Sequence, residues 1–163
     1  MSSLATAIFG DNVNLSIASL PLTIILSALP HWYTIYLASA NKVQGGWTNQ
    51  NPRAFVARLN AKAASGKKLS DLEDTILRGQ AAQQNGFEWW GMWAVAVVFG
   101  YLMKEPKASM DRYTIIHVAS RIVYNILYVS TRRRKYSYLR TAAFQIGLYP
   151  AMAIFCRAAK VLA

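Results

Sequence analysis

Four long stretches of the chain are almost free of charged residues. Between Asp11 and Lys42 lie 30 positions without a formal charge, and about 20 apolar residues are enough to cross the hydrocarbon core of a bilayer. Three later stretches are each interrupted by one charged residue: 79–103 by Glu88, 113–131 by Arg121 and 136–156 by Arg140. The pattern predicts four membrane-spanning helices at approximately 14–41, 76–103, 109–131 and 136–160.

The connections between these stretches indicate how the four helices are arranged. The second connection, around Lys104–Lys107, is short, which favours antiparallel neighbours. We therefore expect an all-α, integral membrane four-helix bundle with up-down topology, formed by residues 1–163 as a single domain. The first connection contains helix-start signals at Asn51-Pro52 and at a capping box, Ser70–Glu73. Two prolines inside the first stretch predict a kink in the first helix.

Composition and charge agree with a membrane protein and add an orientation. Hydrophobic residues make up 54% of the chain and charged residues 15%, whereas soluble domains carry about 25% charged residues. The net charge is +11, and the basic residues concentrate in loop one, 42–77, and loop three, 132–135. The positive-inside rule places both loops in the cytosol and both termini on the lumenal side, although Arg157 and Lys160 argue in the other direction.

The same features disfavour several classes of function. The basic residues adjoin apolar stretches without an aromatic stacking platform, so we expect no nucleic-acid partner. The single cysteine, Cys156, excludes an intrachain disulfide. The sequence offers no His/Cys/carboxylate cluster with metal-ligand spacing, no phosphate-binding loop and no Ser-His-Asp candidate, so we expect no metal. Membrane lipids are expected partners, with the basic run 132–135 contacting their phosphates.

Polar residues inside the predicted spans are the candidates for function, because a charge at the bilayer centre costs about 2.5–3.5 kcal/mol on insertion scales. They form two stripes, one on each middle helix: Arg78, Asn85 and Glu88, and Arg121, Tyr124 and Tyr128. A structural alternative is an Arg121–Glu88 ion pair that fixes the helix register. Tyr124 and Tyr128 could equally anchor a membrane interface, and His117 is expected to be a packing residue.

These stripes also resemble the motifs of a known family. The second helix matches the pattern R-x-x-x-A-x-x-N-x-x-E with Arg78, Ala82, Asn85 and Glu88. The third helix is similar to an R-x-x-Y-x-x-x-Y element through Arg121, Tyr124 and Tyr128. Two shorter motifs agree, the L-R-[ST] that opens the fourth helix and an N-P-R after the first: Leu139-Arg140-Thr141, followed by Gly147, and Asn51-Pro52-Arg53. From roughly 32 to 155 the chain resembles the family of membrane-associated proteins in eicosanoid and glutathione metabolism, MAPEG.

The resemblance implies a fold, a ligand and a reaction class. Members form homotrimers of four-helix protomers and bind glutathione between neighbouring subunits near the cytosolic face. The resemblance implies an endoplasmic reticulum protein that is a glutathione transferase or peroxidase, with a lipophilic substrate entering from the bilayer. Arg140 matches the catalytic arginine that favours the thiolate of glutathione. By the same resemblance, the residues expected to bind glutathione are Arg78, Asn85, Glu88, Arg121, Tyr124 and Tyr128.

Several departures from the family pattern leave alternatives open. Ala81 and Gln84 stand where some members carry further arginines in the second helix. Loop three is longer than in one enzyme type of the family, so an arginine among 132–134 could take the thiol role of Arg140. The main alternative is a non-catalytic lipid-binding or scaffold protein of the same fold. A third reading is an unrelated membrane protein whose intramembrane charges serve assembly or transport.

Overall fold

The computed structural model describes residues 13–163, and this part of the chain is helical without any β-strand. Four long helices are α2 (Leu15–Ala40), α4 (Asp71–Leu102), α5 (Lys107–Ser130) and α6 (Ser137–Val161). A shorter helix, α3 (Pro52–Ala64), and two 3₁₀ turns, Val43–Gly45 and Arg134–Tyr136, lie in the connections. The predicted all-α class is therefore confirmed for the described residues. The N-terminal tail, whose lumenal side the charge argument predicts, lies outside them.

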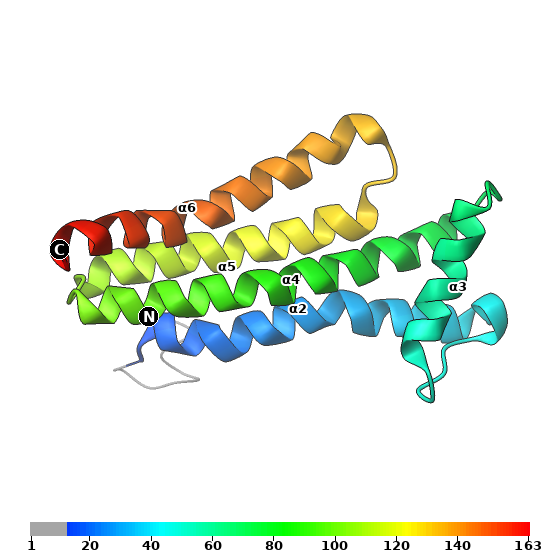
Figure 1. The fold of residues 1–163 in the computed structure, drawn as a ribbon, viewed down its shortest axis with the longest axis horizontal. Helices are drawn as coiled ribbons and strands as arrows, with labels where there is room; N and C mark the ends of the chain where they lie inside the picture. Colours follow the sequence, from blue (N-terminus) through cyan, green and yellow to red (C-terminus); the bar gives the residue numbers. More distant parts are fainter. Residues whose placement is uncertain (1–12) are drawn as a thin grey trace, which may run out of the picture.

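The four long helices lie side by side, and the chain reverses direction between consecutive ones (Figure 1). Helix α2 packs against α4 and α5, while α6 packs against α5 and α4. One core cluster lies between the helices near the start of α2 and the end of α6, and it contains Trp93, Val97, Met110 and Ile154. This packing brings α4, α5 and α6, which carry the polar stripes and Arg140, into contact with one another.

Helix α4 begins at Asp71, several residues before the start predicted from the apolar run at 76. The cause is the capping box, in which the Ser70 Oγ accepts a hydrogen bond from the Glu73 N–H at 3.2 Å. The Glu73 carboxylate in turn accepts from the Ser70 N–H at 2.8 Å. The box satisfies two backbone N–H groups at the helix start, so α4 extends beyond its apolar run.

Loop one contains a helix that the list of predicted spans does not include. Asn51 caps α3 by accepting from the Ala54 N–H at 3.2 Å, and Pro52 occupies the first turn, where a proline is tolerated. Helix α3 runs across the ends of α2 and α4 (Figure 1). Its Phe55 and Leu59 are fully buried in a second core cluster that includes Ile76 of α4.

Small residues allow α2 and α4 to approach closely. An alanine Cβ at Gly86 would lie 2.6 Å from the Ser27 Oγ, and one at Gly79 would lie closer still to the Thr34 Cγ2. Both distances are below van der Waals contact. The α2–α4 pair therefore depends on glycine in the way that membrane helix pairs with small interface residues do.

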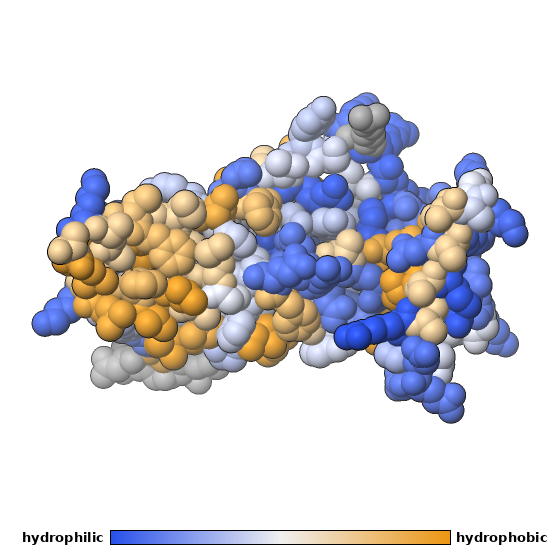
Figure 2. Space-filling view, in the orientation of Figure 1, coloured by the Kyte–Doolittle hydropathy of each residue, from blue (hydrophilic) through white to orange (hydrophobic). Residues whose placement is uncertain are grey.

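Two helices of the described chain, α2 and α6, are long and apolar enough to cross a membrane. The sequence predicts four spans, and these two are supported by length and composition. Helices α4 and α5 are long enough but carry more polar residues, so their composition alone does not identify them as membrane spans. The outer surface is nevertheless rich in exposed large apolar side chains, which gather toward the end that holds the C-terminus (Figure 2). Such an extensive exposed apolar surface is typical of a protein that contacts lipid.

Candidate functional site

A buried arginine on α5 joins the two polar stripes. The Arg121 guanidinium donates a hydrogen bond to the Asn85 Oδ1 of α4 at 3.3 Å. Its Cζ also lies 4.5 Å from the centre of the Tyr124 ring, one turn further along α5. Arg121 and Tyr124 are each only 5% exposed. A guanidinium held between an amide oxygen and an aromatic face keeps favourable partners despite its burial.

The contacts continue from α5 to the start of α6. The Tyr124 and Tyr128 rings meet edge to face with their centroids 5.3 Å apart. The Arg140 Cζ lies 4.1 Å from the centre of the Tyr128 ring. We call the series Asn85, Arg121, Tyr124, Tyr128 and Arg140 the site row. It brings together five of the seven predicted site residues on three helices.

Two aromatic residues that the sequence analysis does not select complete the wall of the site row. The Phe144 ring lies 6.1 Å from that of Tyr124 and 5.3 Å from that of Trp89. Phe144 follows Arg140 by one helical turn, and Trp89 follows Asn85 by one turn. The signal that could have found them is therefore the i, i+4 spacing from residues already selected.

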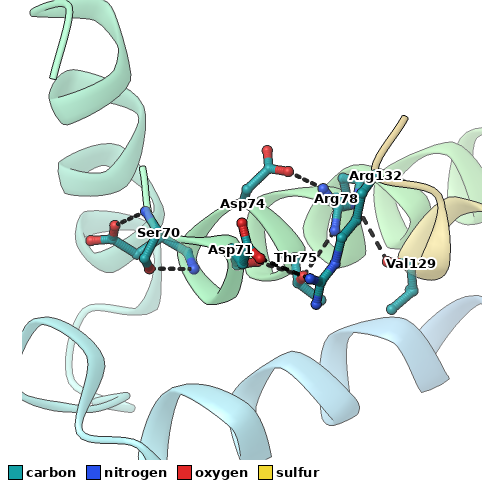
Figure 3. Close-up of polar contacts among 8 residues, drawn as sticks. Ser70, Asp71, Asp74, Thr75, Arg78, Val129 and Arg132 are labelled. Atoms are coloured by element: carbon teal, nitrogen blue, oxygen red, sulfur yellow. Dashed lines mark hydrogen bonds and ion pairs between the residues drawn. The ribbon is translucent and has the colours of Figure 1, made fainter. Parts of the chain in front are cut away.

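Arg78 lies outside the site row and is engaged by neighbouring groups of the same chain (Figure 3). Its Nε donates to the Val129 carbonyl of α5 at 3.3 Å, and its Nη2 donates to the Thr75 Oγ1 at 2.8 Å. It also forms an ion pair with Asp74. Arg132, one of the alternative thiol-activating arginines, donates to Asp71 at 2.8 Å in the same network.

Glu88 does not form the ion pair with Arg121 that the sequence analysis offers as a structural alternative. Its carboxylate accepts a hydrogen bond from Gln84 at 2.9 Å and lies at the exposed surface. Three residues of α-helix correspond to a rotation of about 300°, so Glu88 is turned about 60° away from Asn85. That rotation carries Glu88 off the face that meets α5, and Arg121 bonds to the amide instead.

The site row has a positive electrostatic character. It contains two guanidinium groups and two phenols but no carboxylate, so its charge is uncompensated within the row. Residues 13–163 contain no group of three or more His, Cys or acidic residues that could hold a metal ion. The arrangement is suited to an anionic ligand that one arginine contacts from the α6 side.

Two other features are relevant to function. His117 stacks on Trp93 with the ring centroids 4.2 Å apart, and its Nδ1 lies 3.2 Å from the Gly147 carbonyl. It is a packing residue, as expected from the sequence. A pocket of about 640 Å³ with both polar and apolar walls, which the sequence analysis does not foresee, lies between α2, α3 and α4. Its wall includes Arg53, Gln80 and Gln84.

Comparison with known proteins agrees with the motifs. No curated protein and no solved structure matches the chain. The model of the MAPEG family, in contrast, matches residues 18–160, nearly the whole chain. The matched region contains the complete site row, all of α4 and α5, and nearly all of α2 and α6. The chain therefore belongs to the MAPEG family, whose members are membrane proteins of glutathione and eicosanoid metabolism.

Proposed function

We propose that this chain is a membrane-bound, glutathione-dependent transferase or peroxidase that acts on hydrophobic electrophiles or lipid hydroperoxides. The observation that carries the proposal is the position of Arg140. Its guanidinium rests on the Tyr128 ring at the end of a continuous row of side chains. The inner members of that row, Arg121 and Tyr124, are buried.

The side chains present suit glutathione, which carries two carboxylates, one ammonium group and a thiol. Arg140 supplies a fixed positive charge because a guanidinium does not lose its proton in proteins. When bound, glutathione supplies the thiol, whose ordinary pKa is about 8.5 and falls beside a cation. Tyr128 orients the guanidinium through its ring face. Glu88 has an exposed carboxylate that can accept a hydrogen bond from the ammonium group.

We also propose that the protein works as a homotrimer, with glutathione between neighbouring copies. Gln84 and Glu88 are exposed on α4 although they lie within its apolar run. A charged side chain facing lipid near the bilayer centre costs about 2.5–3.5 kcal/mol on insertion scales. A neighbouring copy that covers this face of α4 would remove the cost and would close the site row from outside.

The proposed placement in the membrane follows from the same argument. All four long helices span the bilayer as a single domain, with the polar faces of α4 and α5 turned away from lipid. Loops one and three lie in the cytosol and both termini in the lumen of the endoplasmic reticulum. The charge of the two loops supports this orientation, because ten basic residues lie in 42–77 and 132–135 against three acidic ones.

Calorimetric titration of the detergent-purified protein with glutathione, together with an ultraviolet scan for thiolate, tests the proposal. We expect binding between micromolar and millimolar affinity, weakened by Glu88→Gln. Arg140→Ala is expected to abolish the thiolate absorbance while binding persists. Arg132→Ala is the matched control, because Arg132 is bonded to Asp71 and should leave the thiolate signal intact. Absence of binding at millimolar glutathione would overturn the enzyme proposal.

A second candidate function is supported by a separate observation. An apolar groove of about 520 Å³ lies between α2 and α5 and is lined by residues such as Leu29, Tyr33 and Ile126. A non-catalytic lipid-binding or scaffold protein would use this groove and would not need the site row. Binding of a fluorescent fatty acid that survives Arg140→Ala, without any glutathione binding, would favour this candidate.

A further inference from the structure

The positive charge of the molecule is concentrated at one end, which we call the α3 end. Residues 42–78 and 132–135 contain eleven basic residues and three acidic ones. The hydrogen bond from Arg132 to Asp71, at 2.8 Å, places both segments at this end. Hydrophilic residues dominate this end in Figure 2, whereas apolar residues dominate the other. The two ends of the four helices therefore present different surfaces.

The three carboxylates of the α3 end are all used within the protein. Glu73 pairs with Lys62 at 2.7 Å, Asp71 pairs with Arg132, and Asp74 pairs with Arg78. The Lys62 ammonium and the Ser70 N–H hold the pKa of the Glu73 carboxyl at about 2, well below its ordinary value. The Glu73 carboxylate therefore remains charged at neutral pH, and all three carboxylates are engaged by basic side chains of the same chain.

Several basic side chains at the α3 end have no carboxylate within ion-pair distance among the described residues. They are exposed to the surroundings, and they include Arg53, Arg58, Lys67, Lys68, Arg133 and Lys135. Since the nearby acids are already paired, this excess positive charge is not compensated within the described residues. A surface of this charge favours an anionic occupant over a neutral or cationic one.

The length of α4 gives the depth of α3 relative to the membrane. With 32 residues, α4 is about 48 Å long, and the hydrocarbon core of a bilayer is about 30 Å thick. The excess places the first turns of α4, ahead of the apolar run that starts at Gly79, among the headgroups. Helix α3 docks on these turns through Leu59, which packs with Ile76, and through the Lys62–Glu73 ion pair.

Helix α3 also has the orientation of a helix that lies at a membrane surface. It crosses the ends of α2 and α4 instead of continuing either helix (Figure 1). Phe55 and Leu59 are fully buried against the other helices, and Arg53 and Arg58 are on its exposed surface. If the long helices span the bilayer, α3 lies along the membrane plane at headgroup depth.

We propose that the α3 end is a binding surface for the headgroups of anionic phospholipids. The proposal rests on the membrane placement proposed above and does not depend on glutathione chemistry. The basic side chains contact lipid phosphates, while the Lys62–Glu73 pair fixes α3 so that they point toward the headgroup layer. Lipid fits better than a nucleic acid, because the basic residues lie at headgroup depth without a series of stacking aromatics.

The test uses the purified full-length protein in nanodiscs that contain phosphatidylcholine with or without phosphatidylglycerol. Native mass spectrometry of the released protein counts the retained lipids of each kind. The test variant is the triple change Arg58→Gln, Lys67→Gln and Lys68→Gln. Arg53 is left unchanged because it lines the pocket between α2, α3 and α4. The matched control removes the same charge from exposed residues at the other end: Lys104→Gln, Arg112→Gln and Lys160→Gln.

We expect the wild type and the control to retain phosphatidylglycerol in preference to phosphatidylcholine. In the test variant, the ratio of retained phosphatidylglycerol to phosphatidylcholine should fall at least tenfold. Each basic residue near an anionic surface contributes about fivefold in affinity, so three contribute up to about a hundredfold at low salt. The preference should weaken as the ionic strength rises.

An equal loss in the test variant and the control, or no preference in the wild type, would overturn the lipid proposal. So would tighter binding of a short RNA or an acidic peptide than of the anionic lipid at the same salt concentration. Melting curves in phosphatidylcholine alone check that the variants fold. Glutathione titration of the same samples is a separate readout, so a failure here is distinct from a failure of the enzyme proposal.

Discussion

A hydrogen bond between helices replaces one that a proline removes from α2, and it allows a sharp test of the packing. Pro30 lies inside α2 and has no N–H, so the Leu26 carbonyl, four residues earlier, lacks its usual donor. The Asn125 Nδ2 of α5 donates to this carbonyl at 2.7 Å. We expect Asn125 to contribute to stability through this hydrogen bond when residue 30 is proline, and not when residue 30 is alanine.

The magnitude follows from what each change leaves unpaired. Asn125→Leu beside Pro30 leaves the Leu26 carbonyl without a donor. In the Pro30→Ala background the backbone N–H at position 30 is restored and bonds to that carbonyl. Hydrogen bonds between membrane helices contribute about 0.6 kcal/mol on average and up to about 1.7 kcal/mol. The Asn125 Oδ1 is buried without a hydrogen-bond partner. Removing this oxygen should stabilise the protein by the same amount in both backgrounds, so this effect cancels when the two are compared. We therefore expect a coupling of about 1 kcal/mol.

The assay is a double-mutant cycle measured by reversible unfolding with sodium dodecyl sulfate in mixed micelles. Asn125→Leu should lower the free energy of unfolding by about 1 kcal/mol more with Pro30 than with Pro30→Ala. In thermal scans this difference corresponds to about 2–4 °C for a domain of this size. Equal effects of Asn125→Leu in the two backgrounds would refute the reasoning, whatever the sign of the single effects.

Two further predictions concern the contacts of α4. Glu73→Gln should raise hydrogen exchange of α3 amides about tenfold, since a charged hydrogen bond from the part-exposed Lys62 is worth about 1–2 kcal/mol. The wild type should show the same change with acid: its carboxyl pKa is lowered to about 2, so the stabilisation is present above pH 4.5 and lost as pH falls through 2. If hydrogen exchange of the α3 amides changed neither in Glu73→Gln nor in acid, both predictions would be contradicted. Gly86→Ala should lower stability by about 1–3 kcal/mol, because its Cβ would lie 2.6 Å from the Ser27 Oγ. Gly91→Ala is the control and should leave stability unchanged, because the added Cβ would have open space around it. Equal melting points of the two variants would contradict the close packing at Gly86.

Much of the fold can be predicted because its signals are local in sequence. Uncharged stretches and the capping box lie within a few residues of the elements they define, so each long helix has a counterpart among the predicted ones. The predicted start of α4 is wrong because it follows the apolar run, although the capping box at Ser70 starts the helix earlier. Helix α3 is absent from the predicted elements because only Phe55 and Leu59 mark its buried face. Its cap at Asn51 is the one local indication.

The candidate site is harder to predict because its contacts join residues far apart in sequence. The spacing of Arg121, Tyr124 and Tyr128 places them on one face of α5, which requires only helix geometry. Whether Arg121 meets Asn85 or Glu88 depends on a rotation of about 60° around α4. Charge alone favours the carboxylate, and the structure instead shows the amide. Sequence can find the stripes but not their pairing.

The order of burial along the site row suggests how the fold prepares Arg140 for a ligand. Arg121 and Tyr124 are almost completely buried, and Arg121 is tied to Asn85, so their positions are set by the packing of α4 against α5. Tyr128 rests against Tyr124, and Arg140 rests against Tyr128. Each contact limits the freedom of the next side chain, and the guanidinium at the end loses less entropy when it binds an anion. On the proposed function, the buried Arg121 is a positioning residue and Arg140 is the group that would touch the ligand.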